Sequence, residues 1–486
     1  AANLFERIRR ATMPALGLML IDANPLPENS KNPGERALIA FLTFVAKHTG
    51  TVVVQNGRDT KFPGVSRENT ALANTLLRRG MITRVYRTPI QPDDPPIRLW
   101  GATCNDTRKH EVGGSSVDNN DAAFTAMLAE AVERYIWDSE TDYFKKPIVA
   151  TITQIAKNGT YLDPRRFAGF SAHDRATDHA LTIHDDSKFL WIQGRSLIDN
   201  AVTAVPAQII SRSVRTSAQV KSEPLIRHPS TIGLATWPTR EGALLAGALE
   251  VIEREAYMIM WLHQLSVPRI DIGSIPQKPT SLDALLAMCE RYRYRVHALL
   301  MPTDAPAYAI AVILEDTVGN TPRFAIGLNA HRSLTHAVEH AILEALRARR
   351  FARSKLDSAG TEHTVSVEDI GHYDRIDYWA TSEHAEKLSF LIEGPLISAP
   401  EREFEGVTIA QHLNLIITWC KENGLECVSV PLTSSRSNPT NWTIEMVVIP
   451  QLHPTYMTEK QRQLHQLQDL TIQRSWISTP WDKTKL

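Results

Sequence analysis

The sequence has few cysteines, no excess of either charge and no long apolar run, and each shortage excludes a class of protein. Its four cysteines, Cys104, Cys289, Cys420 and Cys427, include no C-x-x-C pair, which argues against a disulfide scaffold or a cysteine zinc ribbon. Lys plus Arg number 53 and Asp plus Glu number 54, so a strongly basic nucleic-acid binder is disfavoured. No window approaches the ~18 apolar residues of a membrane-spanning helix. We therefore expect a protein of the reducing cytoplasm that binds neither nucleic acid nor membrane.

The familiar nucleotide-binding loops are also missing. The chain contains no Gly-Lys dipeptide, which excludes a Walker A loop, and no G-x-G-x-x-G pattern. The run Gly113-Gly114-Ser115-Ser116 precedes a predicted helix, and we expect it to form a turn at the helix N-terminus that can hold an anion. If a nucleotide binds, metal-holding carboxylates must replace the phosphate loop.

What the chain does contain is typical of a globular α/β protein. It is 43% hydrophobic and 22% charged over 486 residues, enough for about two to four domains. The first 80 residues predict a small α/β extension with a helix over Gly34–His48, a strand over Thr51–Gln55 and a helix over Asn69–Arg79. The proline-rich segment 87–100 predicts an extended connector. We therefore divide the chain into an extension, 1–80, and a main domain, 81–486.

The main domain alternates long helices with strands. Helices are expected over Asp121–Trp137, over Glu241–Leu262 and from about Ser333 to Arg353. The strand-like runs are Phe189–Ile192, Ala204–Ile210, Ala307–Leu314, Arg323–Leu328, 427–432 and 444–450. This alternation predicts mixed sheets packed with long helices.

One helical pattern occurs twice. The segments AEAVERY (129–135) and LEVIERE (249–255) both contain Glu-x-x-Glu-Arg, whose charged positions share one helix face. Ordinary surface pairs of this kind contribute only about 0.3–0.5 kcal/mol and remain an alternative. The residues concerned are Glu130, Glu133 and Arg134 in the first copy, and Glu250, Glu253 and Arg254 in the second.

The surroundings of the second copy favour a functional role. From Ala243 to Leu262 nearly every other residue is apolar, which predicts a buried helix. Each unpaired ion buried on such a helix costs several kcal/mol. A divalent cation with phosphates is a natural counterpart, since Mg²⁺ prefers hard oxygen ligands and arginine binds phosphate oxygens.

These motifs resemble those of the YcaO family. GGSSVDNNDAAFTAMLAEAVERY (113–135) is similar to the first family motif, STIGLATWPTREGALLAGALEVIEREA (230–256) to the second and GLNAHRSLTHAVEHAILEALRARR (327–350) to the third. Two further segments, GMITRVYRTPIQPDDPPIRLWGA (80–102) and WIQGRSLIDNAVTAVPAQII (191–210), resemble the azoline-forming, SagD-like cyclodehydratase branch. The resemblance covers roughly residues 80–450.

The resemblance implies a YcaO fold and an ATP- and Mg²⁺-dependent cyclodehydratase that modifies a ribosomally made, bacteriocin-type precursor peptide. In that chemistry a Cys, Ser or Thr side chain attacks the preceding backbone carbonyl. ATP then phosphorylates the amide oxygen, and loss of phosphate leaves a thiazoline or oxazoline. Phosphorylation is needed because an amide oxygen is a very poor leaving group, so the protein mainly positions the reactants and neutralises the triphosphate.

The resemblance also assigns roles to individual residues. It implies that Glu130, Glu133, Glu250 and Glu253 hold Mg²⁺, that Arg254 contacts phosphates, and that Arg134 orients the first pair. It further implies a nucleotide loop and a closing helix, formed by Ser230, Thr231 and Gly233 and by Glu344 and Arg347.

The sequence departs from the family pattern at several positions. These are Ala126 for Ser, Ser115 or Ser116 near the usual Lys, Ile232 for Asn, Ser or Thr, Glu255 for Asp and Arg347 for Gln. Azoline-forming members typically end in Pro-x-Pro-x-Pro, whereas this chain ends WISTPWDKTKL. Thioamide or amidine formation, and a non-catalytic peptide-docking scaffold, therefore stay open as alternatives.

A different enzyme class is suggested by His336-Ala-Val-Glu339-His340, an H-x-x-E-H pattern on the third long helix. Two histidines four residues apart can bind zinc with the glutamate as general base, as in a metalloprotease. The alternatives are a polar helix face and a contact to substrate, and no third zinc ligand is identified.

The expected partners follow from the resemblance. They are the precursor peptide, a separate leader-binding protein, since the first 80 residues are too short for a complete recognition module, and a second copy of the chain in a homodimer. No flavin or nicotinamide motif is present, so oxidation to an azole would require a separate dehydrogenase.

Overall fold

A computed structural model describes residues 53–55, 61–88, 94–106, 109–139, 147–170, 172–211, 223–359, 371, 375, 378–379, 385–401, 406–432, 438 and 440–458. The helix expected over Gly34–His48 and the C-terminal segment WISTPWDKTKL lie outside these residues. Within them, no helix combines the length and apolar character required to cross a membrane.

The chain forms two compact units. The first comprises residues 1–135 and 350–362, and the second comprises 136–349 and 363–486. The division therefore falls inside two continuous helices, α4 (Asn120–Ser139) and α10 (Leu334–Ala359). The proposed division at residue 80 falls within the first unit and stays a prediction, because residues 1–52 lie outside the described ranges.

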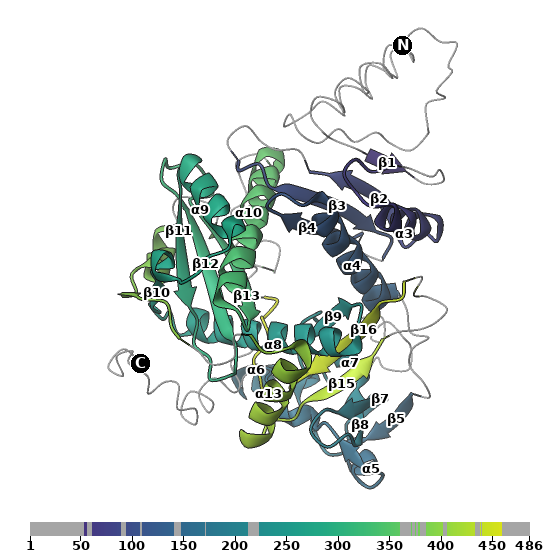
Figure 1. Cartoon of the computed structure of the whole chain (residues 1–486). Helices are drawn as coiled ribbons and strands as arrows, with labels where there is room; N and C mark the ends of the chain where they lie inside the picture. The colour runs from purple at the N-terminus through teal and green to yellow at the C-terminus, as the bar shows by residue number, and fades with distance from the viewer. Residues whose placement is uncertain are drawn as a thin grey trace, which may run out of the picture. The chain divides into compact units, whose positions relative to one another are not determined.

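The first unit is built on one antiparallel sheet (Figure 1). Its strands lie in the order β1 (Val53–Gln55), β2 (Ile82–Arg87), β3 (Arg98–Cys104) and β4 (Glu111–Ser116). Helix α3 (Arg67–Arg78) begins at Ser66, whose side chain accepts the Asn69 N–H, and it confirms the helix expected there. Phe62, Trp100 and Phe124 pack ring against ring in the core, with centroids 4.9–5.9 Å apart.

The run 113–116 is a strand, not the turn expected from its glycines. It forms most of β4 and pairs with β3 from Arg98↔Ser116 to Thr103↔Glu111. The reason for Gly114 is close packing, because a Cβ there would lie 2.0 Å from the Ala123 carbonyl oxygen of α4. The glycine lets the helix backbone touch the strand.

The second unit contains two sheets. The five-stranded sheet has the order β13-β12-β11-β10-β14, and the seven-stranded sheet the order β6-β8-β7-β15-β16-β9 with β5 paired to β7. The strands of the first sheet are β10 (Arg269–Ile270), β11 (Tyr294–Leu300), β12 (Tyr308–Asp316), β13 (Phe324–His331) and β14 (Leu396–Ile397). Those of the second are β5 (Ile148–Thr151), β6 (Thr160–Tyr161), β7 (Lys188–Ser196), β8 (Val202–Pro206), β9 (Leu234–Trp237), β15 (Val428–Pro431) and β16 (Thr443–Val448).

Helix α8 (Arg240–Leu262) connects the two sheets of this unit. It packs against β9 and β16 on one side, against β12 and β13 on the other, and against helix α13 (Ile409–Glu422). Thr239 caps its N-terminus by accepting the Gly242 N–H at 3.2 Å. The shorter helices of the unit are α5 (Ile152–Ala156), α6 (Ala172–Thr177), α7 (Ala207–Ile210) and α9 (Thr280–Arg291).

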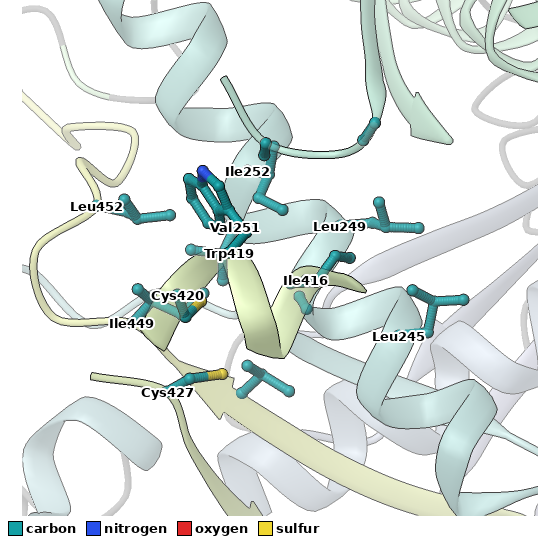
Figure 2. Packing of buried hydrophobic residues seen from close by; sticks show 14 of the residues in the cluster. Leu245, Leu249, Val251, Ile252, Ile416, Trp419, Cys420, Cys427, Ile449 and Leu452 are labelled. Carbon is teal, nitrogen blue, oxygen red and sulfur yellow. The ribbon is translucent and has the colours of Figure 1, made fainter. Parts of the chain in front are cut away.

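The main core cluster lies where α8 meets α13 (Figure 2). Leu245, Leu249 and Ile252 of α8 face Ile416 and Trp419 of α13. All four cysteines of the chain are buried and form no disulfide, and Cys104 lies at the end of β3.

The apolar run 204–210 is shorter as a strand than predicted. Strand β8 ends at Pro206, and the next four residues form the helical turn α7. The Gln208 side chain fixes this turn, since its amide donates to the Pro224 carbonyl and its oxygen accepts the Ile226 N–H, both at 2.9 Å.

Candidate functional site

The second Glu-x-x-Glu-Arg copy lies in the middle of α8, and both of its carboxylates bind backbone amides. The Gly233 N–H donates to Glu250 Oε2 and the Ala330 N–H donates to Glu253 Oε2, each at 3.0 Å. The other oxygen of each carboxylate faces Arg254, at 3.7 Å for Glu250 and 3.1 Å for Glu253. Each carboxylate thus binds a backbone amide through one oxygen and directs the other oxygen toward Arg254.

Strand β13 explains why a buried carboxylate is tolerated here. It is the edge strand of the five-stranded sheet, so alternate N–H groups point away from β12. Glu253 satisfies the Ala330 N–H, and Glu344 of α10 satisfies the Leu328 N–H at 3.0 Å. Buried backbone donors require such acceptors.

The electrostatics of this cluster favour an added cation. Burial raises the pKa of Glu253, and the neighbouring Glu344 and Glu250 raise it further against the opposing effect of Arg254. Burial lowers the pKa of Arg254, but the three carboxylates outweigh burial and keep the guanidinium charged. Three carboxylates around one guanidinium leave an excess of negative charge.

The expected burial of the charged helix holds for part of the signature. Glu253 is 7% exposed, whereas the side chains of Glu250 and Arg254 are 27% and 25% exposed. The cluster therefore runs from the buried centre of α8 to a solvent-accessible rim, where a ligand can reach it.

The loop before β9 packs closely against α8 through one glycine of the loop, Gly233, and one of the helix, Gly247. Gly233 has a φ of +89°, which favours glycine, and its carbonyl accepts the Val447 N–H at 2.8 Å. A Cβ on Gly247 would lie 2.4 Å from the Gly233 carbonyl oxygen. In the same loop, the Ser230 hydroxyl is buried and has no hydrogen-bond partner among the residues that the structure describes. A buried hydroxyl without a partner is costly, and a ligand that accepts its proton would remove that cost.

The first unit repeats this arrangement. The Gly113 N–H donates to Glu130 Oε2 at 3.1 Å, and Arg134 lies 3.5 Å from Glu130 Oε1. The amide and the carboxylate are 17 residues apart in both copies, and 16 apart for Leu328 and Glu344. Three times along the chain, therefore, a helix carboxylate accepts a hydrogen bond from a backbone amide of the preceding strand or loop.

The predicted site residues are divided between the units. Glu130, Glu133 and Arg134 belong to the first, and the second holds Ser230, Thr231, Gly233, Glu250, Glu253, Arg254, Glu344 and Arg347. In the second unit, the structure brings together Gly233, Glu250, Glu253, Arg254 and Glu344. That all eleven residues line one site stays a prediction.

A magnesium ion fits this donor set only together with a ligand. Within the part of the chain that the structure describes, no group of three or more His, Cys, Asp or Glu side chains is arranged to hold a metal ion. Mg²⁺ is usually bound by one or two carboxylates together with waters and substrate phosphates. The Oε1 atoms of Glu250 and Glu253, which face Arg254, meet that requirement.

The H-x-x-E-H residues do not form a zinc-protease centre. The rings of His336 and His340 stack with centroids 3.9 Å apart, and His331 stacks on His336 at the same distance. The Ser281 hydroxyl donates to Glu339 at 2.8 Å, which engages the expected general base. Burial lowers the pKa of His336 to about 3 and that of His331 to about 4, so both rings are uncharged at neutral pH.

Sequence reasoning missed the backbone half of the site. The donors are the amides of Gly113, Gly233, Leu328 and Ala330, whose residue types carry no signal for this role. Glycines at close strand–helix contacts were the available clue. A Cβ on Gly327 would lie 2.1 Å from the Ala341 carbonyl oxygen, just as Gly114 contacts α4.

Comparison with known proteins adds a sequence match and several similar folds. A family model described as "YcaO cyclodehydratase, ATP-ad Mg2+-binding" matches residues 113–453. An uncharacterized protein of Methanothermobacter thermautotrophicus is 24% identical over 237 residues, which cover 49% of this chain and 56% of that protein. The chain thus spans little more than half the length of this relative.

Solved structures share the fold at low identity. A heterocyclase in complex with substrate and cofactor has a TM-score of 0.68 at 18% identity, covering 90% of this chain and 59% of its own. YcaO from Methanopyrus kandleri bound with AMPPCP and Mg²⁺ has a TM-score of 0.57 at 17% identity, covering 78% and 88%. The E. coli microcin synthetase McbBCD complex with pro-MccB17 bound has a TM-score of 0.56 at 14% identity, covering 79% and 92%.

Proposed function

The chain belongs to the YcaO family, and from that premise we propose that it binds ATP with Mg²⁺ and activates backbone amides of a ribosomal precursor peptide. The observation that carries the proposal is the carboxylate cluster on α8. Glu250 and Glu253 each accept a backbone N–H with one carboxylate oxygen and direct the other oxygen toward Arg254. A fixed oxygen pair beside a guanidinium is suited to a cation and its phosphates.

The residues of the second unit have distinct roles in this proposal. Glu250 and Glu253 hold the metal, and Arg254 neutralises phosphate charge. The Ser230 hydroxyl, which has no hydrogen-bond partner in the described part of the chain, donates to the nucleotide. Bound ATP supplies the phosphoryl group that makes an amide oxygen a leaving group. The protein contributes positioning and charge neutralisation, the main terms in phosphoryl transfer.

The first unit contributes a second acidic pair. Glu130 has the same amide anchor and the same arginine neighbour as Glu250. We assign Glu130 and Glu133 to the metal, and Arg134 to the orientation of Glu130. Glu344 and Arg347 of α10 complete the set in the second unit.

The reaction proposed first is cyclodehydration of Cys, Ser or Thr to thiazoline or oxazoline. A leader-binding partner protein presents the peptide in the cytoplasm, and a separate dehydrogenase carries out any later oxidation. The comparison with a heterocyclase bound to substrate and a synthetase complex bound to its precursor supports a peptide substrate. Thioamide or amidine formation uses the same amide activation and is the alternative reaction. Mass spectrometry of a treated precursor separates thioamide formation, which exchanges oxygen for sulfur, from cyclodehydration, which removes one water per ring. An amidine closed by a peptide amine also loses one water, and fragmentation that locates the new linkage distinguishes it from an azoline.

The nucleotide site is tested by calorimetric titration of ATP with Mg²⁺ into wild type and Glu253→Gln. Glutamine keeps an oxygen for the Ala330 N–H but removes the charge. We expect saturable, Mg²⁺-dependent binding to wild type and at least about tenfold weaker binding to the variant, the scale seen when metal-site partners are removed.

Glu241→Gln is the matched control, because Glu241 lies exposed in the first turn of the same helix. Equal affinities of wild type and Glu253→Gln would refute the site. A folded wild type that binds no nucleotide, alone or with precursor peptide, would favour the docking scaffold instead. Peptide binding by the isolated chain as tight as by a reconstituted pair would remove the need for a leader-binding partner.

A further inference from the structure

Three histidines at the end of β13 and in the first turns of α10 are not used by the proposed nucleotide site. His336 and His340 lie four residues apart on the helix, and His331 ends the preceding strand β13. All three belong to the second unit. Their rings form a continuous stack, with successive centroids 3.9 Å apart.

His336 and His340 have the four-residue helical spacing of a chelating pair, but their rings lie face to face. Both residues reach solvent even though their rings are partly buried, and the ring planes are inclined by only 20°. Side chains four residues apart on a helix face the same side, which is why two histidines at this spacing recur as metal ligands. Chelation requires the stacked rings to turn about their terminal side-chain torsions, which are soft, until one in-plane nitrogen of each ring faces a shared ion.

His331 is excluded as a third ligand by its own hydrogen bond. The Ser333 N–H donates to His331 Nδ1 at 3.0 Å. In a neutral imidazole the other nitrogen then carries the proton, so neither nitrogen is free to bind a metal. The His331 ring instead supports the orientation of His336 through the stack.

Glu339 is engaged as well. Its carboxylate accepts the Ser281 hydroxyl from α9 at 2.8 Å. The described residues offer no group of three metal-binding side chains, so the remaining coordination positions fall to water. A two-histidine site of this kind binds a metal without the base and third ligand that a protease requires.

We propose that His336 and His340 chelate a divalent transition-metal ion of the Zn²⁺ class on the surface of α10. Imidazole suits zinc, copper and nickel, whereas magnesium prefers carboxylate and water oxygens. The site is therefore chemically distinct from the acidic cluster and does not depend on the proposed nucleotide function. A bound ion would link the first two turns of α10. These turns lie one turn before Glu344, which accepts the Leu328 N–H of β13.

The test is calorimetric titration of Zn²⁺ alone into the full chain in the presence of excess Mg²⁺, which occupies the carboxylates. The variants are His336→Gln and His340→Gln, and the control is His184→Gln, which changes an exposed histidine in a loop of the same unit. We expect one zinc equivalent for wild type and control, and at least a tenfold loss of affinity in each variant. Zinc should also raise the melting temperature of wild type and not that of the variants, because a ligand that binds only the folded state stabilises it.

Circular dichroism establishes that each variant is folded before titration. Zinc binding that persists unchanged in either folded variant would overturn the proposal, and so would a folded wild type that binds no zinc. Binding lost equally in His184→Gln would place the ion elsewhere and overturn it too.

Discussion

Neighbouring glycines of β4 should respond differently to alanine, because a Cβ would meet the α4 backbone at Gly114 and not at Gly113. In Gly114→Ala the new Cβ would lie 2.0 Å from the Ala123 carbonyl oxygen and 2.5 Å from the Met127 amide nitrogen. In Gly113→Ala the nearest atom is the Trp100 carbonyl oxygen at 3.4 Å, an ordinary contact. The pair therefore isolates close strand–helix packing from any general effect of alanine in a strand.

The cost follows from the distance that α4 must move. A carbon and an oxygen approach to about 3.3 Å, so strand and helix must separate by about 1.3 Å in Gly114→Ala. Overpacking of this kind costs about 1–3 kcal/mol. The Gly113–Glu130 hydrogen bond, now 3.1 Å, would also lengthen beyond its limit, and a bond to a charged acceptor contributes about 1.5–3 kcal/mol. The total is about 3–6 kcal/mol.

Thermal unfolding followed by circular dichroism measures this effect. We expect Gly114→Ala to melt at least about 3 °C below wild type, at about 1 °C per kcal/mol for a chain of 486 residues. Gly113→Ala should remain within about 1 kcal/mol of wild type, since alanine also restricts the unfolded chain. If both variants melt at the same temperature, the close-packing explanation of Gly114 is wrong.

Further predictions concern single buried groups. Ser230→Ala should leave the melting temperature unchanged or slightly higher, because it removes a buried hydroxyl without a partner, yet weaken ATP binding in a titration; a marked loss of stability would contradict this. The raised pKa of Glu253 means that the folded protein binds more protons than the unfolded chain, so its contribution to stability falls as pH rises above about 4.5. Urea unfolding of wild type should lose more stability between about pH 5 and pH 9 than that of Glu253→Gln, and parallel curves would count against it. Arg349→Met should cost about 3–5 kcal/mol in unfolding free energy, because it leaves the buried Asp316 carboxylate, 3.0 Å away, without its guanidinium. Burial raises the pKa of the Cys289 thiol to about 12, so a thiol reagent should label Cys289 only after denaturation.

The sequence predicted the long helices and the acidic pairs well, because both leave periodic signals. The helix expected over Glu241–Leu262 is α8, Arg240–Leu262, and its glutamates do meet Arg254. The helix expected to end near Arg353 continues to Ala359, since neither glycine nor proline stops it earlier. Strong amphipathic or apolar periodicity survives tertiary context.

The errors arose where a partner element decides the local structure. Glycine is favoured in turns and depleted in strands, so Gly113 and Gly114 predicted a turn, and only the close contact with α4 shows why β4 needs Gly114. The helical turn after Pro206 depends on Gln208 hydrogen bonds to residues 16 and 18 positions away. Backbone donors to the glutamates were invisible for the same reason, because any residue type supplies an amide.

The anchoring of Glu253 and Glu344 to β13 also affects how this protein behaves in concentrated solution. An edge strand with open N–H groups is a template on which another chain can form sheet, and β13 is apolar over most of its length. The two carboxylates occupy the outward amides of Leu328 and Ala330 and block that template. Protection of this edge therefore depends on the same side chains that we assign to the proposed nucleotide site. Truncation of either glutamate to alanine would leave a backbone N–H of β13 without its acceptor, whereas glutamine keeps an oxygen that accepts this N–H.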